Sequence, residues 1–188
     1  MARPRSVSDE AILDAANRVM QTLGPSGVTF ASVGLEAGLS PATLVQRYGS
    51  KDGLMRAALL RAWDGLDEMT SSADHSATLD ATGAIELLVS LSDYGDGDQY
   101  SEGLLLLRED MRDPVLRARG ESWGHALARA LGRRLSDDPM KALVLGRLMA
   151  SQWQGSLLWW GFSREGSVTD FVARELKVWC DTVLTQGI

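Results

Sequence analysis

Residues 40–51 read Ser-Pro-Ala-Thr-Leu-Val-Gln-Arg-Tyr-Gly-Ser-Lys, and this stretch decides the fold. Pro41 favours a helix start, because the first helical position needs no backbone N–H, and the pair at 49–50, Gly-Ser, ends the helix. Leu44 supplies a single apolar anchor. Three hydrogen-bonding side chains point to the other side: Thr43, Gln46 and Arg47. A short helix with one anchor and an outward polar face is expected to contact another molecule.

A second short helix is predicted just before this stretch, over residues 30–37, after Thr29. It is expected to bury three apolar side chains: Val33, Leu35 and Ala37. Gly38 then breaks the helix, because glycine adopts the positive φ that such a turn requires. Two short helices joined by residues 37–39 have the dimensions of a helix-turn-helix.

Longer helices are predicted on both sides of this unit. Ser8 is a typical N-cap, and apolar residues recur at helical spacing until the pair at 24–25, Gly-Pro, stops the run. Ser50 caps a fourth helix, which we expect to run from residue 51 to about 70. This helix links two predicted domains, residues 1–50 and residues 51–188.

The rest of the chain is predicted to form helices separated by turns. Residues 70–82 are small and polar, which predicts a loop, and residues 93–98 interrupt the helical pattern again. Five more helices are expected, at about 82–93, 103–112, 115–134, 140–162 and 167–185. Because no strand pattern of convincing length occurs, we expect an all-α chain of about nine helices.

The composition is that of an ordinary folded protein, with 45% hydrophobic and 23% charged residues. The net charge of −6 is unevenly distributed: residues 1–62 hold seven Lys/Arg and five Asp/Glu, and residues 63–188 hold twelve and twenty. A mildly basic front fits a chain whose first third meets an anion. The single cysteine, Cys180, excludes an internal disulfide. Without an apolar signal core or a stretch of roughly 18 apolar residues, the chain is expected to be cytoplasmic.

The two helices predicted at 140–162 and 167–185 carry unusually much apolar surface. The first is apolar around most of its circumference, and such a helix must be covered on more than one side. Two helices of this kind near the end of a small chain suggest a helical interface with a second copy. The alternative is that both helices are buried in the core of one monomer.

The segment from Glu10 to Leu60 resembles the DNA-binding domain of the tetracycline-repressor (TetR) family of bacterial regulators. The matching residues are Ile12-Leu13-Asp14-Ala15-Ala16, Gly27-Val28-Thr29, Ala37-Gly38-Leu39-Ser40, Thr43-Leu44 and Tyr48-Gly49-Ser50-Lys51-Asp52-Gly53-Leu54. This resemblance implies a helix-turn-helix domain of three helices, followed by a helical domain that binds a ligand and forms the homodimer. It also implies a double-stranded DNA operator, an unknown small-molecule effector and no cofactor.

Carried onto the matching positions, the resemblance implies DNA contacts from nine residues: Thr29, Ser32, Ser40, Thr43, Val45, Gln46, Arg47, Tyr48 and Lys51. Arg47 is suited to a guanine edge and Gln46 to adenine. Lys51 corresponds to the family's phosphate contact. For each polar residue, the alternative is an ordinary solvated side chain. Arg3 and Arg5 lie in an arm that either meets the DNA or is simply solvated.

Two residues depart from the family pattern. Val45 stands where tyrosine is common, which removes a hydroxyl and leaves a methyl-bearing surface suited to a thymine methyl group. Gly34 stands where alanine is usual, and we expect it to weaken the second helix by up to about 1 kcal/mol.

Large apolar side chains in the second domain suggest an effector pocket: Met111, Trp123, Leu127, Met149, Trp153 and Trp160. Plain core packing is the alternative for each of them. The polar groups that could orient a ligand there are Tyr100, His125, Gln152 and Gln154. The sequence therefore predicts a ligand-responsive repressor that releases its operator. A DNA-binding regulator without a ligand is the second possibility, and an all-α enzyme is a remote third, because no catalytic or metal-binding motif is present.

Overall fold

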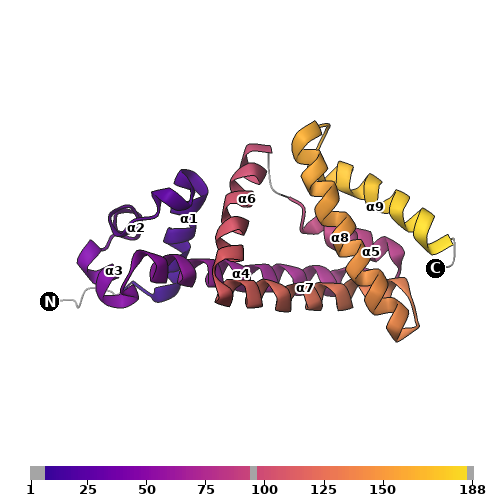
Figure 1. Ribbon diagram of the computed structural model, residues 1–188, viewed down its shortest axis with the longest axis horizontal. Helices are drawn as coiled ribbons and strands as arrows, with labels where there is room; N and C mark the ends of the chain where they lie inside the picture. The colour runs from indigo at the N-terminus through magenta and orange to yellow at the C-terminus, as the bar shows by residue number, and fades with distance from the viewer. Residues whose placement is uncertain (1–6, 94–96, 186–188) are drawn as a thin grey trace. The chain divides into compact units, whose positions relative to one another are not determined.

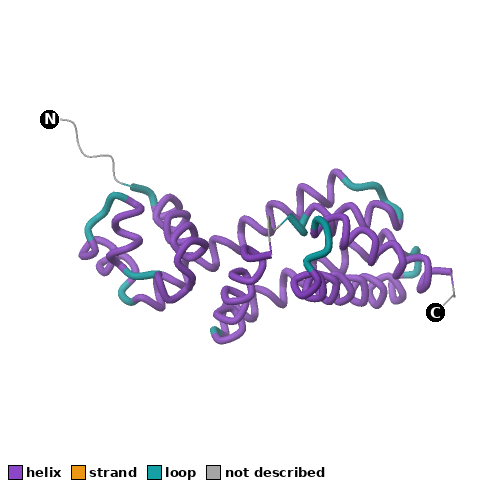
Figure 2. The backbone as a smooth tube through the Cα atoms, turned by 90° about the horizontal axis from the view of Figure 1, so that it is seen from above, coloured by secondary structure: helices purple, strands orange, loops and turns teal. Residues whose placement is uncertain are grey.

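The computed structural model describes residues 7–93 and 97–185. Over these residues the chain contains helices and no strand, which confirms the all-α prediction (Figures 1 and 2). The described part of the chain forms nine helices, namely α1 (Asp9–Gly27), α2 (Phe30–Ala37), α3 (Pro41–Tyr48), α4 (Lys51–Ser76), α5 (Ala81–Ser90), α6 (Gly97–Arg112), α7 (Pro114–Leu135), α8 (Pro139–Ser163) and α9 (Val168–Thr185). None of the described helices is long and apolar enough to cross a membrane.

The helices form two compact units. The first unit contains Met1–Gly65 and Glu102–Arg119, and the second contains Leu66–Ser101 and Gly120–Ile188. The first unit thus holds α1 to α3 and the front of α4, together with most of α6 and the start of α7. The second unit holds α5, α8 and α9 with the remainder of α4, α6 and α7.

One apolar core holds the first unit together. It is built from α1 to α4 and one residue of α7: Ile12, Ala16, Val19, Met20, Val28, Val33, Leu44, Leu54, Ala58, Leu59 and Leu116. Leu44 is fully buried, so the anchor predicted for α3 is confirmed. Leu35 was predicted to be inward but is 88% exposed. It lies two residues after Val33, about 200° around the helix, and therefore faces away from the core.

Gly34 has a structural role that its helix propensity does not reveal. A Cβ atom at this position would lie 2.7 Å from the backbone oxygen of Leu39, in the turn that follows α2. Such a contact is too close for a carbon and a backbone oxygen, so alanine would force the turn and α2 apart. The expected loss of helix propensity is real, but here the glycine allows α2 and the start of α3 to approach each other.

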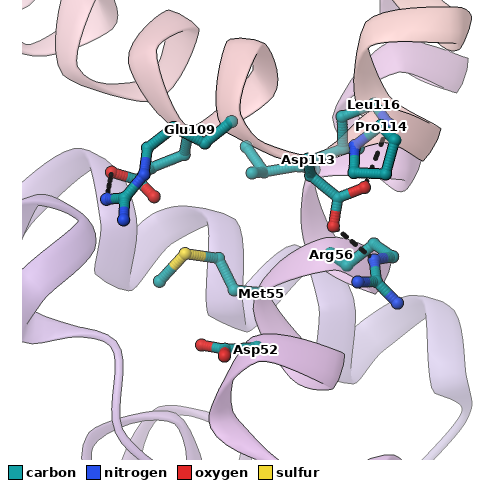
Figure 3. A pocket seen from close by; sticks show the side chains of 9 residues that line it. Asp52, Met55, Arg56, Glu109, Asp113, Pro114 and Leu116 are labelled. Atoms are coloured by element: carbon teal, nitrogen blue, oxygen red, sulfur yellow. Dashed lines mark hydrogen bonds and ion pairs between the residues drawn. The ribbon is translucent and has the colours of Figure 1, made fainter.

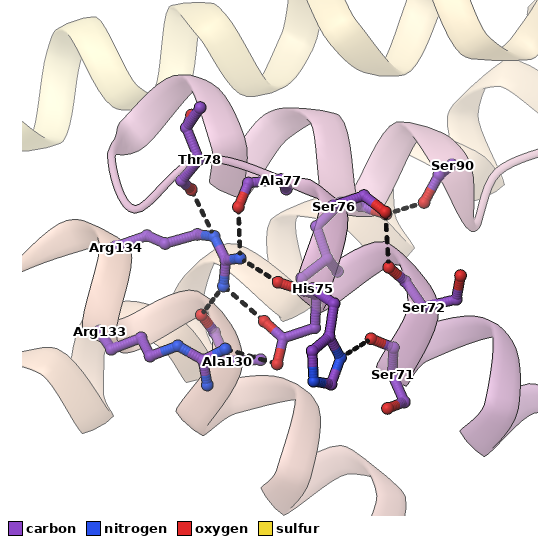
Figure 4. Close-up of polar contacts among 12 residues, drawn as sticks. Ser71, Ser72, His75, Ser76, Ala77, Thr78, Ser90, Ala130, Arg133 and Arg134 are labelled. Atoms are coloured by element: carbon purple, nitrogen blue, oxygen red, sulfur yellow. Dashed lines mark hydrogen bonds and ion pairs between the residues drawn. The ribbon is translucent and has the colours of Figure 1, made fainter.

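The predicted loop over 70–82 is wrong for its first half, because α4 continues to Ser76. Small polar residues favour a loop in isolation, but here the second unit stabilises the helix end. The buried guanidinium of Arg134 donates hydrogen bonds to the carbonyl oxygens of Asp74, Ala77 and Thr78, which satisfies the last turn of α4 (Figure 4). It also pairs with the Asp74 carboxylate at 2.6 Å.

Helix α6 also begins earlier than predicted, at Gly97 instead of residue 103. Arg164, just after α8, pairs with Asp98 at 2.9 Å and donates to the Gly97 carbonyl oxygen. These contacts join residues that are far apart in sequence, and they stabilise the first turn of α6. Residues 94–96 of the predicted interruption lie outside the described residues.

Candidate nucleic-acid interface and ligand groove

The helix-turn-helix is set by local contacts of α2, α3 and the turn between them. Gly38 has a left-handed conformation, with φ of 68°, as the sequence predicts. The next amide, that of Leu39, donates to the Gly34 carbonyl oxygen at 2.8 Å and closes the turn. Ser40 then caps α3, and Pro41 occupies its first turn. Buried Leu44 fixes which face of α3 points outward.

Helix α3 exposes a polar surface with one apolar position in it. Gln46 is exposed and forms no hydrogen bond or ion pair with the other described residues. Val45, the preceding residue, is 45% exposed. These two neighbouring side chains are therefore available for contacts with another molecule.

Arg47 and Tyr48, at the end of α3, are held by the start of α1. The Arg47 guanidinium donates to the Val7 carbonyl oxygen at 3.0 Å and to Asp9 Oδ1 at 3.2 Å. The Tyr48 hydroxyl donates to the same Asp9 oxygen at 3.3 Å. Burial and the neighbouring Asp9 carboxylate raise the pKa of Tyr48 above its usual range. This hydroxyl is therefore a neutral donor at physiological pH.

The hydroxyl groups of four predicted contact residues make hydrogen bonds at the starts of α2 and α3. Thr29 and Ser32 make a reciprocal capping box at the start of α2, and the Ser32 hydroxyl also donates to the Gly27 carbonyl oxygen at 2.8 Å. The Ser40 hydroxyl accepts from the Thr43 amide at 3.2 Å, and the two side-chain oxygens lie 2.9 Å apart. Each hydroxyl has a structural function whether or not it also meets DNA.

Lys51, the first residue of α4, donates from Nζ to the Ser26 carbonyl oxygen at 3.3 Å. The side chain is exposed, so its charge remains open to an anion. Arg3 and Arg5 lie outside the described residues.

The six residues proposed for an effector pocket do not form one site. Trp123, Leu127 and Trp153 line a groove of about 590 Å³ between α7 and α8 in the second unit. Met149 and Trp160 are buried and are not among the residues that line this groove. Met111 belongs to the first unit, is 61% exposed and is not among the residues that line this groove.

The indole groups in the second unit are partly used for internal contacts. Trp123 Nε1 donates to the Thr70 hydroxyl at 3.0 Å, and Trp153 Nε1 donates to the Ser92 hydroxyl at 2.8 Å. Their ring centroids lie 6.3 Å apart. Both indole N–H groups therefore have partners within the second unit, and both rings line the groove.

Two of the four polar groups considered for a ligand line the groove, namely His125 and Gln154. Tyr100 instead packs edge-on against Trp160, with ring centroids 6.1 Å apart. Gln152 lines a different groove, of about 450 Å³, between α8 and α9.

Sequence reasoning missed a cleft in the first unit, between α4 and the turn from α6 to α7 (Figure 3). Its volume is about 390 Å³. On one side Asp113 accepts a 2.6 Å hydrogen bond from Arg56 and caps the amides of Val115 and Leu116. The Arg56 hydrogen bond lowers the pKa of Asp113, and the two amides act in the same direction. The Asp-Pro pair at 113–114 signalled the turn in the sequence, but not its ionic partner on α4.

Within the described residues, no group of three or more His, Cys, Asp or Glu side chains could hold a metal ion. Cys180 is buried, and burial raises its pKa. It therefore remains a thiol at neutral pH.

The chain resembles known proteins both in the sequence of its N-terminal part and in its fold. Residues 12–58 match the family model described as "Bacterial regulatory proteins, tetR family". None of the curated proteins matches the chain. A transcriptional regulator from Rhodococcus sp. Rha1 has a similar structure, with a TM-score of 0.78, 16% identity, and coverage of 95% of this chain and 97% of that one.

Two other solved structures share the fold at similar levels. The multidrug binding protein EbrR, complexed with imidazole, gives a TM-score of 0.67 at 24% identity and covers 94% and 93% of the two chains. A protein from Saccharomonospora viridis in complex with choline gives 0.70 at 21%, with 92% and 95% covered. These likenesses establish the fold of the whole chain. Residues 12–58, which contain the helix-turn-helix, match the TetR family of bacterial regulatory proteins, and the chain as a whole shares the fold of these solved structures.

Proposed function

We propose that the chain is a repressor that binds duplex DNA as a homodimer and is released by a small apolar or aromatic molecule. The observation that carries the DNA-binding part is the exposed face of α3, which Leu44 and the Gly38 turn orient away from the core. An α-helix of this size enters the major groove, where base edges can be read. A DNA-binding regulator of this kind acts in the cytoplasm, and we assign it no enzymatic activity.

The proposed contacts divide into base and phosphate contacts. Val45, Gln46 and Arg47 on α3 are proposed to read base edges. The remaining residues are proposed to meet phosphate or the groove edge: Thr29, Ser32, Ser40, Thr43, Tyr48 and Lys51. In this proposal residues 1–50 bind DNA, and residues 51–188 bind the effector and form the dimer.

A selection experiment tests DNA binding directly. The full chain is incubated with a randomised pool of duplexes, and bound duplexes are amplified over several rounds. Because a symmetric dimer presents two α3 helices, we expect enrichment of an inverted repeat with half-sites about 34–36 Å apart. Failure to enrich any sequence over the starting pool would contradict the proposal.

The proposed dimer forms through α8 and α9. Their outer surface exposes large apolar side chains: Leu148, Leu158, Trp159, Phe162 and Val178. A groove of about 450 Å³ between these helices is lined by Leu148, Trp159, Phe171 and Trp179. Contiguous exposed apolar surface on a water-exposed protein marks an interaction site, and a second copy presents the complementary surface.

Replacing Leu148 by glutamate is expected to raise the dimer dissociation constant by at least about tenfold, because dimerisation would bury an unpaired carboxylate. Sedimentation velocity over a concentration series measures this constant. Leu79→Glu is the matched control, because Leu79 is 71% exposed and lies outside α8 and α9. The proposed interface would be wrong if both variants dimerised like the wild type.

The groove between α7 and α8 is the proposed effector site. Its volume of about 590 Å³ is in the range of small-molecule pockets, and it combines apolar and aromatic walls with a few polar groups. EbrR has been crystallised with imidazole and with proflavin, and the Saccharomonospora protein with choline. Glu121 and Arg147 also line the groove, so it offers one charge of each sign beside the aromatic walls.

Filling this groove should remove ligand binding. Proflavin is a suitable fluorescent probe, and Ala150→Phe is expected to weaken its binding by at least about tenfold, because the new ring would occupy the groove. Ala126→Phe is the control, because Ala126 is exposed on α7 and does not line the groove. If proflavin bound equally well to both variants, its site would be elsewhere.

Release from DNA is proposed to be a population shift. The effector stabilises a dimer conformation in which the two α3 helices no longer match successive major grooves, so DNA affinity falls. A regulator without a ligand is the second candidate, since the buried indoles of the second unit also fit plain core packing. Proflavin titration of the DNA complex distinguishes the two.

A further inference from the structure

Asp9 lies where the proposed DNA-binding surface meets the start of α1. Its Oδ1 atom accepts hydrogen bonds from both Arg47 and Tyr48, at 3.2 and 3.3 Å. The same Arg47 nitrogen, NH1, donates to the Val7 carbonyl oxygen at 3.0 Å. The end of α3 is therefore tied to the start of α1 by one carboxylate and one carbonyl group.

This ion pair is weak enough to exchange partners. The side chain of Asp9 is 72% exposed and that of Arg47 is 32% exposed, and exposed pairs of this kind contribute little to stability. All bonds of the Arg47 guanidinium to the described residues involve NH1. Its remaining donors are open to a second partner, although the carboxylate beside them repels phosphate.

A matching and a non-matching DNA sequence offer Arg47 different replacements for Asp9. Any duplex offers phosphate, which exchanges one anion for another and brings that phosphate near the Asp9 carboxylate. A guanine edge in the right position offers two parallel hydrogen bonds to the guanidinium fork. Exchanging Asp9 for a guanine edge is therefore favourable, whereas exchanging it for phosphate gains little.

We propose that Asp9 is a specificity-determining residue, which holds Arg47 and Tyr48 away from DNA unless a matching base replaces it. This inference rests on the proposed function, in particular on the assignment of α3 to the major groove. Specificity is a difference between two affinities, and an element that opposes the wrong partner raises it. Asp9 would lower the affinity for non-matching DNA more than the affinity for matching DNA.

Glu10 provides a matched control for the charge of Asp9. It lies in the same first turn of α1, carries the same charge, and makes no hydrogen bond or ion pair with the described residues. Removing either charge strengthens binding to any duplex through general electrostatics. Only Asp9 contacts α3, so a difference between the two variants reports the specific contact.

The experiment uses the full chain and two duplexes: one selected by the wild type from a randomised pool, and a scrambled duplex of the same composition. Dissociation constants are measured at fixed salt by fluorescence anisotropy. The specificity ratio is the dissociation constant for the scrambled duplex divided by that for the selected duplex. Asp9→Asn is expected to reduce this ratio by about two- to fivefold, as loss of an exposed ion pair implies. Glu10→Gln is expected to leave the ratio at its wild-type value, and Asp9→Glu, which keeps the carboxylate, is expected to keep most of the wild-type ratio.

Two results would overturn the proposal. One is a ratio that falls equally in the Asp9→Asn and Glu10→Gln variants. The other is weaker binding of Asp9→Asn to both duplexes without a change in their ratio, which indicates only a structural role. Thermal melting of each variant shows whether the fold is intact. In an Arg47→Ala background the effect of Asp9→Asn on the ratio should disappear. If the wild type selects no duplex at all, the proposed function fails, which is distinct from failure of this inference.

Discussion

Replacing Arg47 by alanine is expected to lower the affinity for the selected duplex by about one to two orders of magnitude. A guanidinium that makes two hydrogen bonds to guanine contributes about 1–3 kcal/mol of discrimination against the wrong base, and the variant also loses a positive charge at the DNA surface. Gel-shift titration of the full chain measures the loss. The base preference at one position of each half-site should also relax, because alanine cannot distinguish the bases.

Two further variants separate base reading from charge. Lys51→Ala removes a proposed phosphate contact and should weaken binding to all sequences alike, with a smaller salt dependence. Arg18→Ala removes a charge that pairs with Glu36 on the surface, and it should change DNA affinity only slightly. If Arg47→Ala bound the selected duplex as tightly as Arg18→Ala, then α3 would not be the reading helix. Thermal melting of Arg47→Ala must stay near the wild type, because this side chain also bonds Val7 and Asp9.

The helix-turn-helix was predictable from sequence because short-range contacts determine it. Ser8, Ser40 and Ser50 each accept a hydrogen bond from an amide three residues later, so the signal for each helix start lies within one turn. The Gly38 turn is equally local. The ties from Arg47 and Tyr48 to Asp9 span about 40 residues, and no pattern in the sequence indicates such a pair.

The end of α4 shows why the second unit was harder to predict. Residues 70–76 have the composition of a loop, but Arg134, 56 to 60 residues away, donates to the Asp74 carboxylate and to the carbonyl oxygens of Asp74, Ala77 and Thr78. Tertiary contacts therefore override local preference. The division of the proposed effector residues between groove and core depends on packing for a related reason. Aromatic and Met side chains serve both cores and pockets, and only the three-dimensional packing separates Trp123 on the groove wall from buried Met149.

The second large effect is expected where α7 and α8 cross, in the second unit. A Cβ atom at Gly146 would overlap the backbone oxygen of Ala128 and lie 2.8 Å from the amide nitrogen of Gly132. A Cβ atom at Gly132 would likewise overlap the backbone of Ala142 on α8. The two helices approach each other backbone to backbone at this point. No rotamer change can relieve a clash with backbone, so the helices themselves would have to move apart.

Gly146→Ala is therefore expected to destabilise the protein by about 3 kcal/mol or more, even though alanine favours the helix by about 1 kcal/mol. Thermal melting should show a decrease of roughly 6–12 °C for a chain of this size. Gly124→Ala is the control, because a Cβ atom at that position on α7 has no atom within 4 Å. It should stabilise the protein slightly through helix propensity alone. Equal melting temperatures for the two variants would mean that α7 and α8 are not in backbone contact. The groove between them, whose walls these two helices provide, would then have a different shape, and the effector site proposed there would lose its basis.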